Sequence, residues 1–257
     1  MSESPPDLTR IEQMQLEITS ANQDGTQANI DDIRLHPKPE KGFVILSWDD
    51  GNQNYYDKAA PINDRFGFPA VITMPVRPDK ADEPYFMSVK ELQERQSTGD
   101  DVVVHGSTNA PFAELSRSEL DALLRRNKQW MLDNGLGGAD FIVYPGNNYD
   151  KTALDVISKY CYMGGMNQSG NVNTTGVYGF DPLVLPRTIG HDLKISKQAV
   201  SLAAAHRQCT ILNFHHFDSK DTMGVHEYKK LLAHIDRTAG IEVITFSDLW
   251  AMRQKKA

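Results

Sequence analysis

Continuous apolar runs alternate with amphipathic stretches from residue 42 onward, and both have the lengths of regular secondary structure. The apolar runs predict strands at 43–47, 70–74, 101–105, 141–144, 210–214 and 241–245. The stretches between them predict helices at 54–66, 88–99, 116–134, 152–160, 196–207, 225–238 and 247–253. Apolar strands separated by helices favour a parallel sheet covered by helices. Six or seven such units favour an α/β fold, a distorted (β/α) barrel of about seven parallel strands, over an open sheet.

The first 41 residues follow a different pattern. Two segments of alternating polarity, Met14–Ile18 and Ala28–Leu35, flank a turn that contains Asp24-Gly25, which predicts a β-hairpin. A lone hairpin is marginally stable in water, so we expect it to pack on the main domain, another domain or another subunit. The predicted organisation is therefore a hairpin and linker at 1–41, followed by one domain at 42–257.

Composition excludes several classes of protein. The net charge of −7 and pI near 5.6 argue against a nucleic-acid-binding surface, which needs clustered basic residues. No apolar run approaches the roughly 20 residues that span a bilayer. The first residues lack the basic and apolar regions of a secretory signal, so either the protein is not exported by that route or the chain begins downstream of a signal. Cys161 and Cys209 form no CxxC pair and are expected to be small buried residues.

Polar groups follow four of the predicted strands at the point where each strand ends. The four segments are Trp48-Asp49-Asp50-Gly51, His105-Gly106, Pro145-Gly146 and His215-His216. Functional groups of such barrels lie at the carboxyl ends of the strands, so these side chains are expected to meet at one rim. Two adjacent carboxylates resist ionising together unless a cation lies near. One aspartate could then bind a metal while the other acts as a base.

These segments resemble, in order, the motifs of the polysaccharide deacetylase family, carbohydrate esterase family 4. Ser47–Gly51 resembles the first motif, Thr-Phe-Asp-Asp-Gly, and Val104–Asn109 resembles the second, Ser-His-Gly-x-Thr-His. Tyr144–Asn147 resembles the third motif of one branch, Leu185–Arg187 a later Leu-Pro-Arg segment, and 211–216 the last motif. The resemblance covers about 80% of the chain. Each motif alone is weak, and the ordered set is specific.

The resemblance implies a role for each of these residues. Asp50 and His105 correspond to metal ligands, Asp49 to the general base, and His215 to the general acid. The metal of the family is usually zinc, and Co²⁺, Ni²⁺ and Mn²⁺ are the alternatives. The backbone N–H of Gly146 is a candidate oxyanion donor. The remaining expected substrate or oxyanion contacts are Trp48, Tyr144, Pro145 and Arg187.

Two positions depart from the family pattern. Asn109 stands where the second metal-binding histidine is expected. Either its amide oxygen binds the metal, or another group or water takes that place, or the metal is lost and the domain only binds glycans. Val143 stands where many members carry an arginine that orients the base, and Arg187 is the candidate to approach the site instead.

The resemblance implies a metal-dependent hydrolase that removes N-acetyl, or also O-acetyl, groups from an acetylated polysaccharide of the cell surface or cell wall. The alternative is a catalytically impaired module that keeps the fold and binds carbohydrate. Such a substrate implies an extracellular or cell-surface location, and the absence of a signal leaves a virion-associated protein or a shortened chain open. Residues 26–35 also resemble the last strand of jelly-roll carbohydrate-binding modules, so 1–41 could be the end of such a β-sandwich.

Overall fold

The structure is a computed structural model that describes residues 36, 38–75, 78–81, 83–106, 110–167, 172–217 and 222–254. Pro37–Ala257 forms one compact unit. The predicted hairpin of the first 41 residues, with its packing on a partner, lies outside the described residues.

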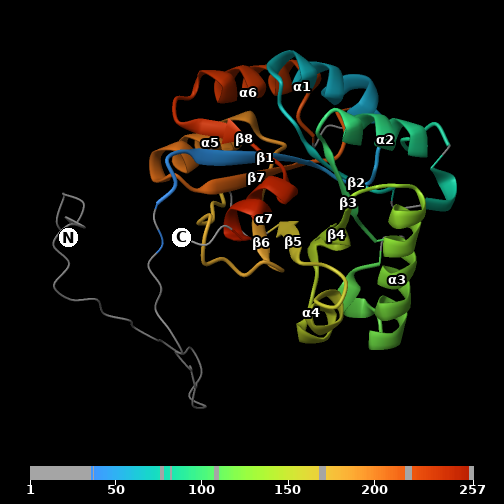
Figure 1. The fold of residues 1–257 in the computed structure, drawn as a ribbon. Coiled ribbons are helices and arrows are strands. Elements are labelled where there is room, and N and C mark those ends of the chain that lie inside the picture. Colours follow the sequence, from blue (N-terminus) through green and yellow to red (C-terminus); the bar gives the residue numbers. More distant parts are fainter. Residues whose placement is uncertain are drawn as a thin grey trace, which may run out of the picture. The chain divides into compact units, whose positions relative to one another are not determined.

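Eight strands alternate with helices along the described chain (Figure 1). The strands are β1 (Gly42–Trp48), β2 (Val71–Thr73), β3 (Asp101–Val104), β4 (Gly138–Val143), β5 (Met163–Asn167), β6 (Leu185–Ile189), β7 (Cys209–Phe214) and β8 (Ile241–Val243). The α-helices are α1 (Ala60–Phe66), α2 (Val89–Ser97), α3 (Arg117–Asp133), α4 (Lys151–Ile157), α5 (Leu193–His206), α6 (Val225–Arg237) and α7 (Phe246–Gln254). A π-helical turn, η1 (Tyr55–Ala59), precedes α1, and 3₁₀ turns lie at η2 (Pro78–Lys80), η3 (Phe112–Glu114) and η4 (Pro145–Asn147).

Seven parallel strands close into a barrel, which confirms the predicted fold class. The strand order runs from β2 to β7 and returns through β1 to β2, with β8 added beside β1. β1 pairs with β8 along Gly42–Val44 and with β2 only at Ser47 and Trp48. The first half of β1 therefore faces a different neighbour from the second half, and this shared edge makes the barrel irregular.

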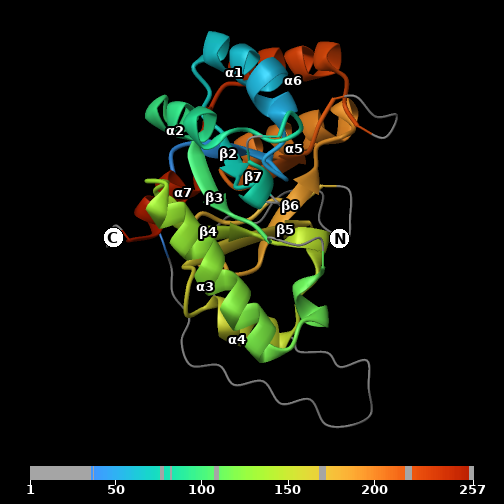
Figure 2. The ribbon, with the colours of Figure 1, turned by 90° about the vertical axis from the view of Figure 1, so that its right-hand side faces the viewer.

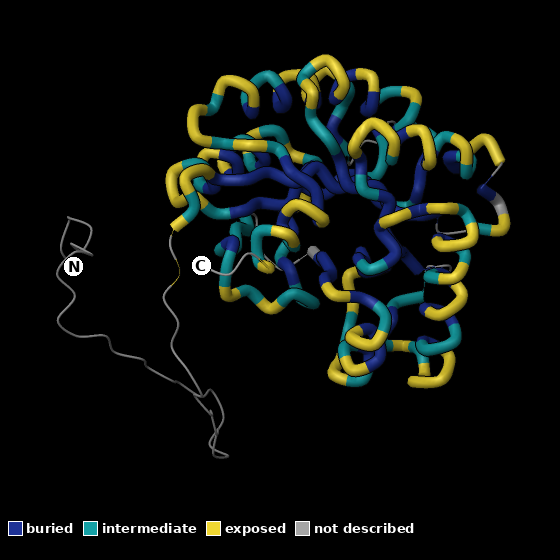
Figure 3. The backbone as a smooth tube through the Cα atoms, in the orientation of Figure 1, coloured by how far each residue is buried: buried dark blue, intermediate teal, exposed yellow. Residues whose placement is uncertain are grey.

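Alternation along the strands separates two apolar layers. One layer contains Phe43, Ile45, Val103 and Ile211 together with Phe246 of α7, and it fills the barrel. The other contains residues of opposite parity and packs them against α1 to α6, which surround the barrel in Figures 1 and 2. Figure 3 shows the same arrangement, with buried strands inside and exposed positions on the outer surfaces of the helices. The parity of a residue on its strand therefore decides whether its side chain enters the barrel or the helical layer.

Local sequence signals set several helix ends. Ser116 accepts a hydrogen bond from the backbone N–H of Glu119 at 3.3 Å, and the Glu119 carboxylate accepts the N–H of Ser116 at 2.9 Å. Ser88 and Glu91 form the same capping box at the start of α2. These reciprocal bonds satisfy N–H groups that the first turn of a helix leaves without partners.

Two barrel strands were absent from the sequence prediction. β5 has the sequence Met-Gly-Gly-Met-Asn, and β6 contains Pro186. Glycine and proline have low strand propensity, so the sequence gives no local signal for either strand. Within the described residues, no helix has the length and apolar character needed to cross a bilayer. Cys161 and Cys209 are buried free thiols, as predicted, and burial raises the pKa of each to about 12.

Candidate active site

The carboxyl ends of β1, β3, β4 and β7 meet around one small cavity. Its volume is about 190 Å³. The residues that line it are Asp49, Asp50, His105, Tyr144, Pro145, Gly146, Asn147 and His215. The structure thus brings together the two aspartates and two histidines that the sequence singled out.

Asp49 points into the barrel because it shares the parity of Phe43 and Ile45 on β1. Arg187 on β6 donates from both terminal nitrogens to the Asp49 carboxylate, at 2.8 and 3.0 Å. The side chains of Asp49 and Arg187 are only 4% and 1% exposed. Two parallel charge-assisted hydrogen bonds fix the orientation of the carboxylate and offset the cost of burying both charges.

Arg187 therefore does not occupy the predicted position among the substrate and oxyanion contacts. Its side chain lies beneath Asp49 in the barrel interior, where it also donates to Ser47 Oγ at 3.2 Å. It is a positioning residue for Asp49. Many members of the family resembled carry an arginine for this purpose at the place of Val143, and here Arg187 supplies the guanidinium group instead. Val143, at that place, contributes its side chain to the barrel core and its carbonyl to His105.

Asp50 and His105 form the second pair of the site. His105 Nε2 lies 3.4 Å from Asp50 Oδ1, and His105 Nδ1 lies 2.7 Å from the Val143 carbonyl oxygen. Since a carbonyl oxygen only accepts, Nδ1 carries a proton. In a neutral ring Nε2 then presents a lone pair toward a carboxylate oxygen. That geometry calls for a cation between the two atoms, either a proton or a metal ion.

The pKa directions agree with this geometry. Burial lowers the pKa of the His105 imidazole, but its hydrogen bond to Asp50 and the charges of both aspartates outweigh burial, and the pKa is raised. Burial raises the pKa of the Asp50 carboxyl, but the bond to His105 and the nearby imidazoles outweigh it, and the pKa is lowered. Each group thus favours the charged form of the other.

The backbone at Asp50 is unusual for a residue with a side chain. Its φ is 69°, and Gly51 follows with φ of 61°. Such left-handed conformations cost free energy in residues other than glycine and cluster at functional sites. A Cβ on Gly51 would lie 2.5 Å from the Pro75 nitrogen, so only glycine fits there. The turn re-aims the Asp50 carboxylate toward His105.

His215 faces Asp49 from the end of β7. Its Nε2 lies 3.9 Å from Asp49 Oδ2, and its side chain is 34% exposed. The His191 ring contacts the His215 ring edge to face, with centroids 5.6 Å apart. His216 has the opposite parity and lines a neighbouring pocket instead. An imidazole that is partly open to the cavity and close to a buried carboxylate can donate or accept a proton there.

Two predicted substrate contacts, Trp48 and Tyr144, have buried side chains. Trp48 is 1% exposed and packs in the helical layer, with its ring stacked on Phe214 at 5.0 Å. Tyr144 is also 1% exposed, and its hydroxyl donates to the Leu183 carbonyl at 2.7 Å. Burial raises the pKa of the Tyr144 hydroxyl above its usual range. Both residues have the outward parity on their strands, so neither ring has a face free for a sugar.

Pro145 and Gly146 do line the cavity, in the turn that follows β4. Gly146 adopts φ of 64°, and an added Cβ would lie 3.2 Å from Pro111 Cγ. The positive φ and the nearby Pro111 both favour glycine here, and the Gly146 backbone lines the cavity, as an oxyanion donor must. The oxyanion role itself stays a prediction.

The metal hypothesis can be compared with the donors that the structure describes. In that part of the chain, no three histidine, cysteine, aspartate or glutamate side chains group closely enough to hold a metal ion. Asp50 and His105 supply two donors, and the imidazole gives its other nitrogen to a backbone carbonyl, as metal-bound histidines do. The third predicted ligand, Asn109, lies outside the described residues. The described pair therefore fits a divalent ion as an incomplete ligand set.

Comparison with known proteins identifies the family. The sequence profile of the polysaccharide deacetylase family matches residues 36–164, half of the chain. The chain belongs to the polysaccharide deacetylase family. A search of curated protein sequences found no match to this chain.

Solved structures show the same fold at low sequence identity. The family 4 carbohydrate esterase domain of a multidomain xylanase from the hindgut metagenome of Trinervitermes trinervoides is 15% identical, with a TM-score of 0.57 over 82% of this chain and 91% of that domain. A family 4 acetyl xylan esterase from Clostridium thermocellum, in complex with cobalt, is 17% identical, with a TM-score of 0.54 over 82% and 91% of the two chains. A family 4 pseudoenzyme from Bacillus anthracis is 13% identical, with a TM-score of 0.57 over 82% and 66%. The family thus associates the chain with carbohydrate esterases and deacetylases, and one structural neighbour is a pseudoenzyme.

Proposed function

We propose that this protein hydrolyses acetyl groups, N-linked or also O-linked, on a cell-surface or cell-wall polysaccharide, with the help of a divalent metal. The observation that carries the proposal is the buried Arg187–Asp49 pair, open to the cavity beside Asp50, His105 and His215. A structural pair would have no reason to present its carboxylate to a cavity lined with histidines. This substrate implies that the protein acts outside the cell or at its surface.

The residues divide the proton transfers of hydrolysis between them. Asp49, held in place by two hydrogen bonds from Arg187, takes a proton from the attacking water. The water oxygen bonds to the acetyl carbon, and the Gly146 N–H donates to the carbonyl oxygen as negative charge develops there. His215 gives a proton to the leaving amine or alcohol as its bond to the acetyl carbon breaks. The products are acetate and the free sugar group.

Asp50 and His105 would hold the metal, which we take to be zinc, with Co²⁺, Ni²⁺ and Mn²⁺ as alternatives. Bound there, a divalent ion would polarise the acetyl carbonyl and lower the pKa of water. Asn109 is the proposed third ligand. An amide oxygen is a weaker zinc ligand than an imidazole nitrogen, so affinity is expected to be below that of a two-histidine site.

The second candidate function is a glycan-binding module without turnover. Asn109 in place of the second histidine, and the pseudoenzyme among the structural neighbours, favour it. The retained pair of Arg187 and Asp49 opposes it, because glycan binding alone does not require a buried carboxylate that an arginine orients.

Metal content and acetate release separate the two candidates. The full chain is purified, dialysed against each metal and assayed on chitin oligomers, peptidoglycan and acetylated xylan. Asp50→Ala and His105→Ala are expected to lose bound metal and activity together, whereas the control His215→Ala keeps the metal and loses activity. Metal retained in both ligand variants would contradict the assignment of ligands.

Substitutions of Asn109 test whether this residue is the third metal ligand. Asn109→His is expected to tighten zinc binding about tenfold or more, and Asn109→Ala to weaken it, as equilibrium dialysis would measure. Unchanged affinity in Asn109→Ala would assign the third position to another group. If the wild-type chain and Asn109→His both bind no metal and release no acetate, the glycan-binding function is the better account.

A further inference from the structure

Strand β5 carries two consecutive glycines in the barrel wall. Gly164 and Gly165 lie within a strand of five residues that pairs with β4 on one side and β6 on the other. Glycine weakens a strand, because it adds no side chain to the packing and loses much conformational entropy on folding. Neither of the two has a positive φ, so backbone conformation does not require glycine at either position. The requirement comes from close neighbours.

The two glycines face opposite sides of the sheet and meet different neighbours. A Cβ on Gly164 would lie 2.8 Å from Tyr144 Cε2, in the layer between the barrel and the helices. A Cβ on Gly165 would lie 3.2 Å from Arg187 Cδ and 3.2 Å from Phe246 Cζ, inside the barrel. Carbon atoms in contact prefer a separation of roughly 3.5–4.0 Å. Both positions are therefore filled by their neighbours without a side chain of their own.

The side chain of Arg187 passes Gly165 on its way to Asp49. Leu185 is the residue of β6 that pairs with Gly165, so Arg187, two positions farther along β6, points to the same face of the sheet. Its Cγ and Cδ atoms lie 3.5 and 3.2 Å from the place where a Cβ of residue 165 would stand. A side chain on β5 at this position would occupy space that the arginine stem already fills.

Packing, rather than hydrogen bonding, fixes the course of this stem. The hydrogen bonds of the guanidinium group to Asp49 and Ser47 all start from the two terminal nitrogens. Arg187 Nε donates to no group among the described residues. The stretch of the side chain from Cβ to Nε is therefore held by contacts with its neighbours, which include the backbone of Gly165.

Phe246 confines the same space from its other side. It is the first residue of α7, it is 0% exposed, and its ring packs against Phe141 with centroids 6.3 Å apart. A ring in a densely packed core cannot move aside without disturbing its neighbours. The arginine stem has more rotatable bonds than the ring and yields more easily. A methyl group added at Gly165 is therefore expected to displace the stem of Arg187, and the guanidinium group with it.

We propose that Gly165 is a positioning residue for Asp49, which acts through Arg187. The bare backbone at residue 165 leaves room for the arginine stem to cross the barrel, and the guanidinium group then places two donors on the Asp49 carboxylate. This accounts for glycine at a wall position where a β-branched residue would stabilise the strand. The inference rests on the proposed function for the reaction that Asp49 serves, whereas its geometric part can be tested without that reaction.

The NMR signals of the guanidinium group test the geometric part. The full chain is prepared with isotopically labelled arginine, and the Nη–H signals of Arg187 are identified by their loss in Arg187→Lys. Gly165→Ala is expected to shift or broaden these signals, because the two parallel bonds to Asp49 become unequal. Gly164→Ala, which crowds Tyr144 on the opposite face, is the matched control and leaves the Arg187 signals in place. Unchanged Arg187 signals in Gly165→Ala would overturn the inference, whatever the activity.

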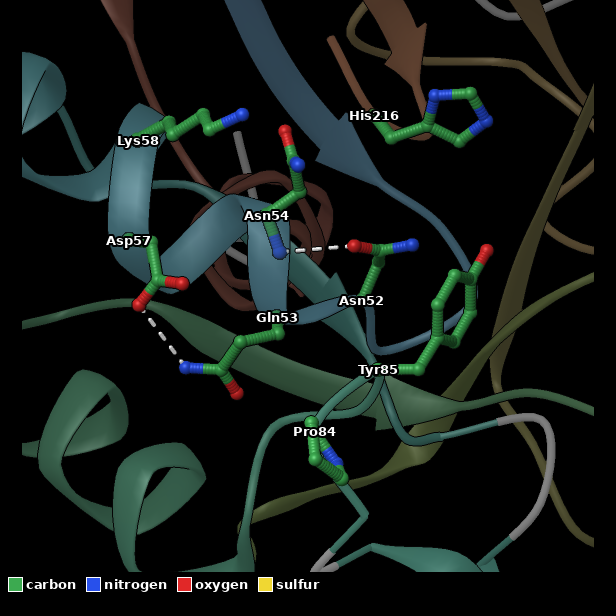
Figure 4. Close-up of a pocket in the computed structure, with 8 residues that line it drawn as sticks. All are labelled: Asn52, Gln53, Asn54, Asp57, Lys58, Pro84, Tyr85 and His216. Atoms are coloured by element: carbon green, nitrogen blue, oxygen red, sulfur yellow. Dashed lines mark hydrogen bonds between the residues drawn. The ribbon is translucent and has the colours of Figure 1, made fainter. Parts of the chain in front are cut away.

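Kinetics test the consequence for the proposed reaction. Neither the catalytic cavity nor the pocket of about 400 Å³ beside it, drawn in Figure 4, is lined by Gly165 or Arg187. Gly165→Ala is therefore expected to reduce kcat about 10–100-fold and to leave KM within about twofold, since positioning is lost and substrate contacts are kept. A KM that rises while kcat holds would overturn the positioning role.

A double variant shows whether the effect passes through Arg187. Arg187→Ala removes the stem and leaves room for the added methyl group, so Gly165→Ala in that background is expected to change kcat less than about twofold further. A full additional loss in that background would overturn the inference. Should Gly165→Ala alone not fold, urea unfolding of the double variant decides: stability equal to that of Arg187→Ala supports the shared space, and lower stability overturns it.

The outcomes separate this inference from the proposed function. Displaced Arg187 signals in Gly165→Ala, in a protein whose wild-type chain releases no acetate, would support the geometric part and overturn the catalytic proposal. Displaced signals with an unchanged kcat would overturn the positioning role, even though the protein is a working deacetylase.

Discussion

Two buried arginines hold carboxylates in this protein, and their surroundings differ. Arg95 Nε donates to Asp100 at 2.8 Å, and its terminal nitrogens donate to Asp64 at 3.0 and 2.9 Å. Asp100 also accepts the Tyr55 hydroxyl at 2.6 Å and the Ala70 N–H at 2.8 Å. Every side-chain nitrogen of Arg95 and both carboxylate oxygens of Asp100 are therefore hydrogen-bonded, and the group ties α1 and α2 to the start of β3.

The Arg187–Asp49 pair is less completely hydrogen-bonded. Arg187 Nε has no hydrogen-bond partner among the described residues, and Asp49 faces a cavity with His215 at 3.9 Å. A hollow alone does not distinguish the pairs, because one of about 430 Å³ also lies over Arg95 and Asp100. The difference is in the neighbours: complete hydrogen bonding around Asp100, and titratable groups around Asp49. Complete networks stabilise a fold, whereas incomplete ones beside histidines are suited to chemistry.

Removing each arginine is the strongest test of this comparison. Arg187→Met and Arg95→Met each leave a buried carboxylate without its cation, so each is expected to lower the free energy of unfolding by about 3–5 kcal/mol. Only Arg187→Met should also reduce kcat of the protein that remains folded. Urea unfolding, with acetate release measured on the folded fraction, checks both effects. Equal loss of kcat in the two variants would remove the distinction between the pairs.

Neutralising each aspartate tests the same comparison with a smaller structural change. Asp49→Asn keeps the shape and removes the proposed base, so kcat is expected to fall by about 10²–10⁴-fold. Asp100→Asn should leave kcat nearly unchanged and reduce stability by about 1–3 kcal/mol, because a charged acceptor with three donors is lost. Steady-state kinetics and thermal unfolding measure the two effects. Substantial activity in Asp49→Asn would assign the base to another group.

Removing a helix cap far from both arginines measures the effect of a purely structural change on stability and on kcat. Ser116→Ala removes the side-chain acceptor of the α3 capping box, so it is expected to cost about 1 kcal/mol of stability with no change in kcat. Ser88→Ala, at the start of α2, is the matched comparison. A larger effect on kcat than on stability in either variant would show that these helix ends influence the site.

The sequence predicted most of the fold because the signals for these elements are local. Apolar runs followed by amphipathic stretches indicated six of the eight strands, and the capping box at Ser116 indicated the start of α3. β5 and β6 carry no such signal, since glycines and a proline occupy them. Their neighbours in the closed barrel supply the missing stabilisation.

Alternation along the strands explains why the rings of Trp48 and Tyr144 are buried. Trp48 and Tyr144 each precede or follow inward residues by one position, so their rings face the helical layer. The motif resemblance drew them into the site because they adjoin its residues in the chain. Adjacency along a strand places neighbouring side chains on opposite faces.

The sequence by itself determined which residues stand at the strand ends, and hence that Asp49, Asp50, His105 and His215 share one rim. Only the tertiary structure decided which buried side chain contacts them from inside the barrel. Arg187 is 138 positions from Asp49 in the chain, on a strand without a local signal, and closure of the barrel brings it beneath the carboxylate. The physical reason is that the period of a strand fixes the face of each side chain locally, whereas the partners on that face depend on which distant strands the closed barrel places opposite it.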